Sequence, residues 1–196
     1  NDARRQRQMC IRDRLLKVRI GSDCSTDSTD SLLTEFMKSE DSIDFLRMKK
    51  RSGKSSIINQ MVNRGDSEII VGTDANIFFR PDALKELVTP LVLNSKIHLV
   101  GGNLVYRGIE HNSSDGVSKN EESYMNWEND LKQKEGELWG CAMGVEGGCY
   151  AIRREAFMTI PKGTLMEDFF HTMNVLKSRK KVVHTNQAIC TEDVSN

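Results

Sequence analysis

Short apolar runs alternate with longer amphipathic stretches along the chain from residue 15 onward. The runs that have the length and composition of strands are 15–23 (LLKVRIGSD), 44–48 (DFLRM), 68–74 (EIIVGTD), 97–106 (IHLVGGNLVY), 147–154 (GGCYAIRR) and 181–185 (KVVHT). The stretches that carry apolar residues at helical spacing are 28–38, the segments after Gly53 and Pro81, 121–139 and 167–177. Strands that alternate with helices predict one α/β domain with a mostly parallel central sheet.

Three aspartates lie where this pattern places the ends of elements. Asp23 and Asp74 follow predicted strands, and Asp168 opens a predicted helix. Ligands of open α/β sheets bind outside the carboxyl ends of the strands, so we expect the three carboxylates to converge on one cleft. The dipole of its helix is expected to favour the ionised, proton-accepting form of Asp168.

The segment VGTDANIFF places Asp74 and Asn76 two residues apart. In an extended chain, side chains at this spacing point the same way. Two oxygen side chains so placed could hold a hard divalent cation that takes its other ligands from a diphosphate and water. Alternatively, the two residues only cap the helix that follows, and the spacing alone leaves both interpretations open.

Composition and charge exclude several classes of protein. Lys plus Arg and Asp plus Glu are both 28, so the chain lacks the basic excess of a nucleic-acid-binding domain. The five cysteines form no C-x-x-C pair, which predicts no disulfide framework and a reducing, cytosolic compartment. No apolar run approaches the ~18–20 residues that cross a bilayer, and residues 1–14 lack the apolar centre of a signal peptide.

Residues 1–14 (NDARRQRQMCIRDR) show neither a helical nor a strand period. Their QMCIRDR string resembles translated sequencing-adapter sequence, so we expect 1–14 to be a non-native leader and 15–196 to be the domain. A basic arm that binds an acidic partner is the alternative.

Five segments, in order, resemble family-2 glycosyltransferases of the GT-A fold. They are SDCSTDST (22–29), RSGKSSIIN (51–59), TDANIFFRPDALKELV (73–88), GGCYAIRREAF (147–157) and MEDFFHTMNVLKSRKKVVHTNQAICTED (166–193). The resemblance extends over nearly all of 15–193 and is strongest to bacterial synthases of the cellulose and poly-N-acetylglucosamine type. It implies the three-layer GT-A-like α/β fold of nucleotide-diphospho-sugar transferases, without the family's first strand and its C-terminal Q-x-x-R-W and membrane segments.

The resemblance implies a donor site. Asp23 would contact the nucleoside, and Asp74 with Asn76 would hold a divalent metal, Mg or Mn, on the diphosphate. Asn76 departs from the acidic residue that the family has there, so the metal affinity could be lower. Lys54 would reach the donor phosphates or would simply be a solvated lysine.

The resemblance also implies an acceptor site. Gly147 and Gly148 would line the substrate-binding side of the acceptor strand, and Glu167-Asp168 would be the catalytic pair, with Asp168 the base. Thr191-Glu192-Asp193 spells the same motif. We expect that second pair to fall after the last strand and therefore assign the role to Glu167-Asp168.

The implied reaction is inverting transfer of a hexose from a nucleotide-diphosphate sugar, expected to be a UDP-sugar, to a saccharide or lipid-linked acceptor. It would serve polysaccharide or cell-envelope synthesis at the cytoplasmic face of a bacterial inner membrane. Attachment to the membrane would come only from segments absent from this chain, which is itself expected to be soluble.

Two other functions compete with glycosyl transfer. Gly53-Lys54-Ser55 before a helix resembles part of a P-loop, but that signature needs a glycine at the position of Met48. The other is a non-catalytic module that binds nucleotide sugars without turning them over, against which the intact Asp168 argues.

Overall fold

The computed structural model describes residues 16–40, 42–107 and 117–193, with only the backbone for 117–126. The described residues form two compact units. The smaller unit lies within Asn1–Asp66 together with Ile160–Thr164, and the larger within Ser67–Thr159 and Leu165–Asn196. Residues 1–14 lie outside the described part, so the expected boundary of the domain at residue 15 stays a prediction.

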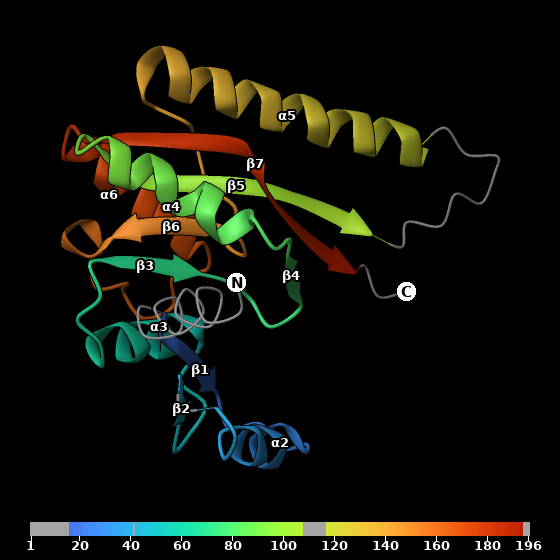
Figure 1. The fold of residues 1–196 in the computed structure, drawn as a ribbon, viewed down its shortest axis with the longest axis vertical. Coiled ribbons are helices and arrows are strands. Elements are labelled where there is room, and N and C mark those ends of the chain that lie inside the picture. The colour runs from blue at the N-terminus through green and yellow to red at the C-terminus, as the bar shows by residue number, and fades with distance from the viewer. Residues whose placement is uncertain (1–15, 41, 108–116, 194–196) are drawn as a thin grey trace, which may run out of the picture. The chain divides into compact units, whose positions relative to one another are not determined.

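The larger unit is built on a five-stranded sheet with the strand order β3-β6-β5-β7-β4 (Figure 1). The strands are β3 Ile69–Gly72, β4 Ile77–Phe79, β5 Ile97–Arg107, β6 Tyr150–Arg153 and β7 Lys181–Asp193. The helices of this unit are α4 Ala83–Leu93, α5 Val117–Trp139, α6 Glu167–Lys177 and the 3-10 turn η1 Arg154–Ala156.

The sheet is mixed, so the expectation of a mostly parallel sheet is wrong. Only β5 and β7 run parallel, whereas β3 with β6, β6 with β5, and β4 with β7 are antiparallel. The segment between α5 and β6 explains part of this result. Ala142 N donates to Val182 O at the start of β7, and Gly102 N, midway along β5, donates to Cys149 O. This irregular segment therefore runs in the same direction as β5 and β7. The strand β6 that follows it turns back and pairs with β5 in the antiparallel direction.

Apolar packing on both faces of the sheet holds the larger unit together. On one face, α4 buries Ala83, Leu87 and Leu91 completely, four residues apart, as the helical period predicts. On the other face, Val175 of α6 packs into a second cluster with β-sheet residues such as Ile152. Burial of one such large side chain is worth roughly 1.5–3 kcal/mol, so these clusters dominate the stability of the unit.

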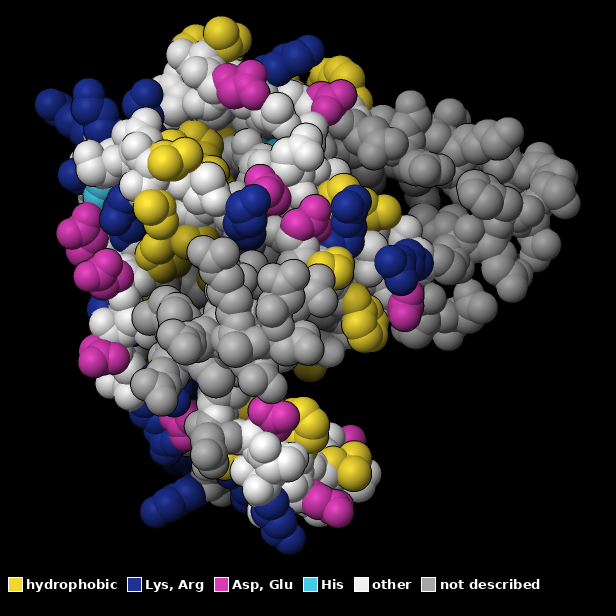
Figure 2. Space-filling model, viewed as in Figure 1, with side chains coloured by type: hydrophobic (Ala, Val, Ile, Leu, Met, Phe, Trp, Pro, Cys, Tyr) yellow, Lys and Arg dark blue, Asp and Glu magenta, His cyan; other side chains and the backbone are white. Residues whose placement is uncertain are grey.

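The strand β5 continues through the Gly101-Gly102 pair, with an irregularity in its pairing with β7 just after Gly102. A Cβ on Gly102 would lie 2.4 Å from Cys149 Sγ, so only glycine allows this close approach. The helix α5 packs on β7, where a Cβ on Gly136 would lie 3.0 Å from the Cα of Val183. Among the described residues, no helix is both long and apolar enough to span a membrane. On the face shown in Figure 2, acidic and basic side chains of the larger unit are interspersed with exposed apolar ones.

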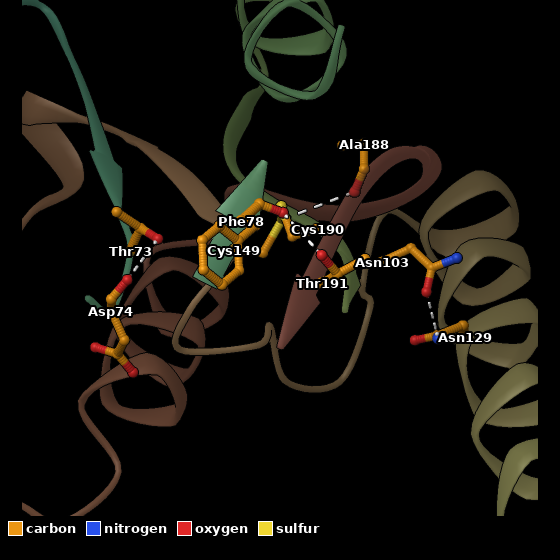
Figure 3. Close-up of a disulfide and its surroundings, with 9 residues drawn as sticks. All are labelled: Thr73, Asp74, Phe78, Asn103, Asn129, Cys149, Ala188, Cys190 and Thr191. Atoms are coloured by element: carbon orange, nitrogen blue, oxygen red, sulfur yellow. Dashed lines mark hydrogen bonds between the residues drawn. A yellow bond between two sulfur atoms is a disulfide. The ribbon is translucent and has the colours of Figure 1, made fainter. Parts of the chain in front are cut away.

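Cys149 and Cys190 form a disulfide inside the larger unit (Figure 3). Both side chains are fully buried, and the two residues are 41 positions apart in the sequence. The expectation of no disulfide is therefore wrong. It rested on local cysteine spacing, whereas this pair meets only because the loop before β6 packs on β7.

The last strand is much longer than the predicted 181–185. β7 pairs with β5 as far as Asp193, across a register shift between Thr185 and Ile189. Its end also pairs with β4, where Glu192 lies opposite Ile77. Thr191–Asp193 therefore lies within the last strand, and the expectation that it follows that strand is wrong. The mixed polar run after Thr185 hid the continuation, because the irregular pairing breaks the alternation of a regular strand.

The smaller unit contains two parallel strands, β1 Val18–Ser22 and β2 Ile43–Arg47, and two helices, α2 Thr29–Phe36 and α3 Lys54–Asn63. Its apolar core is small and is made by Leu46, Met48, Ile57 and Met61. A Cβ on Gly21 would lie 2.2 Å from Ile57 Cγ2, so glycine lets α3 approach β1.

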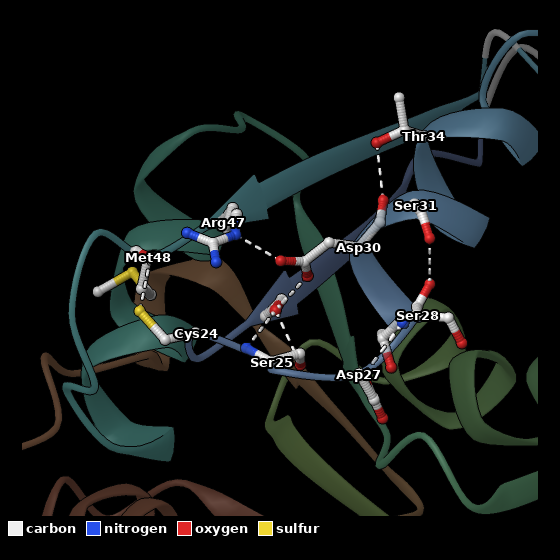
Figure 4. A network of polar contacts seen from close by, with 11 residues as sticks. Cys24, Ser25, Asp27, Ser28, Asp30, Ser31, Thr34, Arg47 and Met48 are labelled. Carbon is white, nitrogen blue, oxygen red and sulfur yellow. Dashed lines mark hydrogen bonds and ion pairs between the residues drawn. The ribbon is translucent and has the colours of Figure 1, made fainter.

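Polar side chains supply much of the remaining structure of the smaller unit (Figure 4). The helix α2 has no buried residue, and Asp30 in its first turn bonds to the Arg47 guanidinium of β2. Ser22 Oγ donates to the other oxygen of Asp30 at 2.6 Å. The Ser22 hydrogen bond and then Arg47 hold the pKa of Asp30 below its usual value. A charged network therefore attaches α2 to the two strands.

Candidate functional site

The negative charges of three carboxylates of the larger unit act on the buried side chain of Tyr150. Tyr150 on β6 is 2% exposed, and a Cβ on Gly72 would lie 2.6 Å from its hydroxyl oxygen. Burial raises the pKa of this hydroxyl, and the negative charges of Glu167, Asp168 and Asp74 raise it further. The structure thus brings Asp74, which follows β3, together with the Glu167-Asp168 pair that opens α6.

Asp168 is half-buried at the start of α6, and its Oδ1 accepts the backbone N–H of Phe169 at 2.7 Å. Burial raises the pKa of this carboxyl, with further increases from the charges of Glu167 and Glu146, and only the backbone hydrogen bonds lower it. The expectation that the helix start would favour the ionised form is therefore outweighed by desolvation. A carboxylate with a raised pKa is a better proton acceptor near neutral pH.

The Gly147-Gly148 pair lies between Asp168 and β4. A Cβ on Gly147 would lie 3.2 Å from Asp168 Oδ2, and a Cβ on Gly148 would lie 2.7 Å from Cγ1 of Ile77. Side chains at these two positions would displace either the carboxylate or the strand that follows Asn76. The backbone therefore approaches both predicted halves of the site, while the substrate-binding role of the two glycines stays a prediction.

Asp74 and Asn76 lie in a turn between β3 and β4, not in an extended segment as expected. Ile77 N donates to Asp74 O at 3.2 Å, and Thr73 Oγ1 donates to the same oxygen at 3.3 Å (Figure 3). The element that follows is a strand, and α4 begins only at Ala83. The alternative in which the two residues cap a helix is therefore wrong.

Glu192 of β7 is a neighbour of Asn76 that sequence reasoning missed. Asn76 Nδ2 donates to Glu192 Oε1 at 2.6 Å, because the antiparallel pairing places Glu192 opposite Ile77. The only sequence signal was the second Glu-Asp pair, Glu192-Asp193. This hydrogen bond uses the amide nitrogen of Asn76, so its carbonyl oxygen remains available to a ligand.

The donor set of Asp74 and Asn76 fits a hard divalent cation in kind. A carboxylate and an amide oxygen are ligands that Mg²⁺ and Mn²⁺ accept, with the remaining positions taken by phosphate oxygens and water. Over the described residues, His, Cys, Asp and Glu form no cluster of three or more with metal-site spacing. A cation here would therefore depend on oxygens from the nucleotide.

His171 of α6, three residues after Asp168, is a core residue. It is fully buried, and the rings of Phe157, Phe170 and Tyr150 have centroids within 6.3 Å of its own. Neither ring nitrogen has a hydrogen-bond partner among the described residues. Burial lowers the pKa of His171 to about 4, so it is neutral at physiological pH.

Asp23 and Lys54 belong to the smaller unit. The two carboxylate oxygens of Asp23 accept the backbone N–H groups of Ser52 at 2.7 Å and Gly53 at 2.9 Å. Lys54, which follows Gly53 in the sequence, is exposed and is the first residue of α3. Two of the amides that a P-loop would offer to phosphate are thus bound to Asp23, which argues against that alternative. Contact of Asp23 with a nucleoside and of Lys54 with phosphate stays a prediction.

Asn59 of α3, the asparagine of the 51–59 segment, has a structural role. Its Nδ2 donates to Ile160 O and its Oδ1 accepts from Ile160 N, both at 2.9 Å. The side-chain amide of Asn59 therefore satisfies both backbone hydrogen-bonding groups of Ile160, as a neighbouring strand would. These two bonds hold Ile160–Thr164 in the smaller unit.

The sequence matches the family model "Glycosyl transferase family 2" over residues 3–160. The match covers most of the chain, so the protein belongs to glycosyltransferase family 2. It ends before Glu167, and the assignment of Asp168 therefore rests on the geometry described above and on its sequence context.

Several solved structures have a fold similar to that of this chain. The mannosyltransferase PcManGT from Pyrobaculum calidifontis, in complex with GDP-Man and Mn²⁺, has a TM-score of 0.71 at 18% identity, over 92% of this chain and 48% of its own. GalNAc-T7 with UDP, GalNAc and Mn²⁺ has a TM-score of 0.66 at 13% identity, over 93% and 38%. Glucosyl-3-phosphoglycerate synthase from Mycobacterium tuberculosis with phosphoglyceric acid has a TM-score of 0.59 at 16% identity, over 92% and 62%.

These TM-scores show that the chain has a GT-A-like fold, as the resemblance of its motifs implied. The chain spans about half the length of the mannosyltransferase, at 48%, and less of GalNAc-T7, at 38%. A comparison with curated proteins found no match.

Proposed function

We propose that this protein transfers a sugar from a nucleotide-diphosphate donor to an acceptor hydroxyl, with Asp168 as the base. The observation that carries the proposal is that Gly147 approaches the half-buried Asp168, with a Cβ position 3.2 Å from its Oδ2, while the charges of Asp74, Glu167 and Asp168 all act on the buried Tyr150 of a family-2 glycosyltransferase. One carboxylate of the group lies in a turn suited to a cation, and another has a raised pKa suited to proton transfer.

On the donor side, Asp74 and Asn76 would hold Mg²⁺ or Mn²⁺, which would neutralise the charge of the departing diphosphate. The hydrogen bond from Asn76 to Glu192 fixes the amide so that its oxygen, and not its nitrogen, is left for a ligand. Asp23 would contact the nucleoside, and Lys54 the phosphates. We expect a UDP-sugar, with a GDP-sugar as the alternative, since the neighbouring structures contain one or the other nucleotide.

On the acceptor side, Asp168 would take the proton of the attacking hydroxyl as its oxygen bonds to the anomeric carbon. The bond from that carbon to the diphosphate breaks in the same displacement, and the nucleoside diphosphate leaves. A single displacement inverts the anomeric centre. Glycine at position 147 lets the backbone lie close to the carboxylate, since a Cβ there would be only 3.2 Å from Asp168 Oδ2.

The motifs favour a hexosyltransferase of polysaccharide or cell-envelope synthesis with a saccharide or lipid-linked acceptor. The full-length protein would then work at the cytoplasmic face of a bacterial inner membrane, held there by segments outside this chain. This part of the proposal rests on the resemblance of the five segments between residues 22 and 193 to bacterial polysaccharide synthases.

Calorimetric titration with UDP and GDP, with and without Mn²⁺, tests the donor site. We expect one diphosphate to bind much more weakly without the ion, and Asp74→Ala to abolish the difference. Asp82→Ala is the matched control, because Asp82 is exposed and makes no side-chain cap on α4. Equal affinities with and without Mn²⁺ would contradict the proposed metal site. Diphosphate binding without turnover of any donor in the full-length protein would instead favour a non-catalytic binding module.

A further inference from the structure

The buried lysine Lys132 contacts Glu146, which lies in the same loop as the Gly147 that approaches Asp168. Lys132 of α5 is 7% exposed, and its Nζ lies 2.7 Å from Glu146 Oε1 and 2.9 Å from Glu128 Oε1. A charge so deeply buried is tolerated only when it is paired and hydrogen-bonded. Burial lowers the pKa of Lys132, but the bonds to Glu146 and Glu128 outweigh it and the net pKa is raised, so the ammonium form persists.

Glu146 connects this lysine to the candidate base. It immediately precedes Gly147, whose Cβ position lies 3.2 Å from Asp168 Oδ2. Cys149 N donates to Glu146 O at 3.0 Å, which closes the loop into a turn. The side chain of Glu146 is thus bound to α5 while its backbone shapes the turn beside Asp168.

We propose that Lys132 is a positioning residue for the candidate base: its ammonium group holds Glu146 and thereby the Gly147-Gly148 backbone against Asp168. The same ion pair balances the negative charge of Glu146 beside the carboxylate. The catalytic consequence rests on the proposed function, but the electrostatic coupling does not.

The titratable groups around Asp168 are Glu167 and the neutral His171 on its own helix, Glu146 on the loop, Tyr150 on β6, and Asp74 after β3. Glu146 has a cationic partner, Lys132, whose Nζ lies 2.7 Å from its Oε1. Loss of Lys132 leaves the charge of Glu146 unbalanced and raises the pKa of Asp168, whereas loss of the Glu146 charge lowers it.

The test is a pH titration of the ¹³Cγ signal of Asp168 in the full-length protein, assigned with Asp168→Asn. We expect Glu146→Gln to move the midpoint to lower pH, and Lys132→Met to move it to higher pH, each by about half a pH unit. Lys134→Met is the matched control, because Lys134 is an exposed lysine on the same helix, and it should leave the midpoint unchanged. Lys132→Arg keeps the charge and should restore the wild-type midpoint.

Midpoints equal to wild type in both Glu146→Gln and Lys132→Met would overturn the proposal. If Lys132→Met does not fold, Glu146→Gln alone decides, since it preserves shape and removes only the charge. This titration needs no substrate, so its failure is distinct from failure of the proposed function, which would show as no binding of UDP or GDP. In turnover, Lys132→Met should lower kcat with little change in KM for the donor.

Discussion

Different forces stabilise the interior of each of the two units. The larger one packs apolar side chains on both faces of a five-stranded sheet, with Leu87, Leu91 and Leu99 fully buried. The smaller one has a core of a few side chains and a helix, α2, with no buried residue. It depends instead on carboxylate and amide groups that bind backbone or charged partners, such as Asp23 on Ser52 and Asn59 on Ile160.

This difference shows that similar aspartates in one chain are used differently. The carboxylate of Asp23 is occupied by two backbone amides and stabilises a loop. Asp168 accepts one local N–H, and burial raises its pKa, so its charged form costs stability. The same substitution at the two positions should therefore have opposite profiles in stability and turnover.

The largest effect is expected from Asp168→Asn in the larger unit. The change keeps size and shape but removes the basic oxygen, so turnover in the full-length protein should fall by roughly 100-fold or more. Stability at pH 7 should be unchanged or slightly higher, because a buried carboxylate with a raised pKa is replaced by a neutral amide. Steady-state kinetics and thermal unfolding measure the two quantities.

Asp193→Asn is the control for this prediction, since Asp193 is exposed at the end of β7 and belongs to the second Glu-Asp pair. It should be nearly silent. Loss of transfer in Asp193→Asn, with transfer intact in Asp168→Asn, would show that the catalytic pair has been assigned to the wrong segment.

The next effect is an acid sensitivity located in the larger unit. Burial lowers the pKa of His171 to about 4, whereas an unfolded chain has a value near 6.5. The unfolded state therefore binds more protons between these values, and stability falls as the pH drops from about 6.5 to 4. His171→Leu should remove roughly 3 kcal/mol of this loss between pH 7 and 4.

Thermal unfolding as a function of pH measures this contribution. None of the four histidines falls within residues 1–66, so the smaller unit should lack this loss between pH 6.5 and 4 and should lose stability only at lower pH, where the low pKa of Asp30 acts. The control is His98→Gln, because His98 has Glu155 as a partner 2.9 Å away. Identical pH profiles of His171→Leu and wild type would contradict the assignment.

A smaller effect is expected from Asp23→Asn in the smaller unit. One amide of the Ser52-Gly53 pair would then face an NH₂ group in place of an oxygen, at a cost of roughly 1–3 kcal/mol. Hydrogen exchange of the Ser52 and Gly53 amides should accelerate, whereas Asp168→Asn should leave them unchanged. If hydrogen exchange of these two amides is unchanged in Asp23→Asn, the Asp23 carboxylate does not stabilise the loop of the smaller unit.

The smallest effect is a stabilisation by Cys24→Gly. Cys24 has φ 58°, a conformation that costs a side-chain-bearing residue about 1–2 kcal/mol and glycine almost nothing. The substitution also removes the bond from Cys24 Sγ to Met48 O, so a net gain of about 0.5 kcal/mol is expected. Cys24→Ala keeps the backbone cost and loses the bond, so it should be less stable than Cys24→Gly in chemical denaturation.

Much of the fold could be predicted because local periodicity identifies single elements. The predicted helix at 167–177 matches α6 residue for residue, and all six predicted strands exist. Strand direction, the length of β7 and the short strand β4 were not predicted. These features depend on irregular segments, such as 140–149, whose course is set by hydrogen bonds to distant strands.

The candidate site also has features that the sequence predicted and features that it did not. The candidate residues Asp23, Asp74 and Asp168 were selected from their places at the ends of elements, because an aspartate that follows a strand or opens a helix has a local signature. The partnerships were not found: Asn76 with Glu192, Lys132 with Glu146, and Cys149 with Cys190. Each pair joins segments that only the tertiary packing brings together.

The sequence by itself determined the kinds of element, the family and the identity of the candidate base and metal-binding groups. Only the tertiary structure decided which carboxylate is occupied by backbone amides and which is buried with a raised pKa. The physical reason is that hydrogen bonding and desolvation, which set the chemistry of an aspartate, come from neighbours far away in the chain.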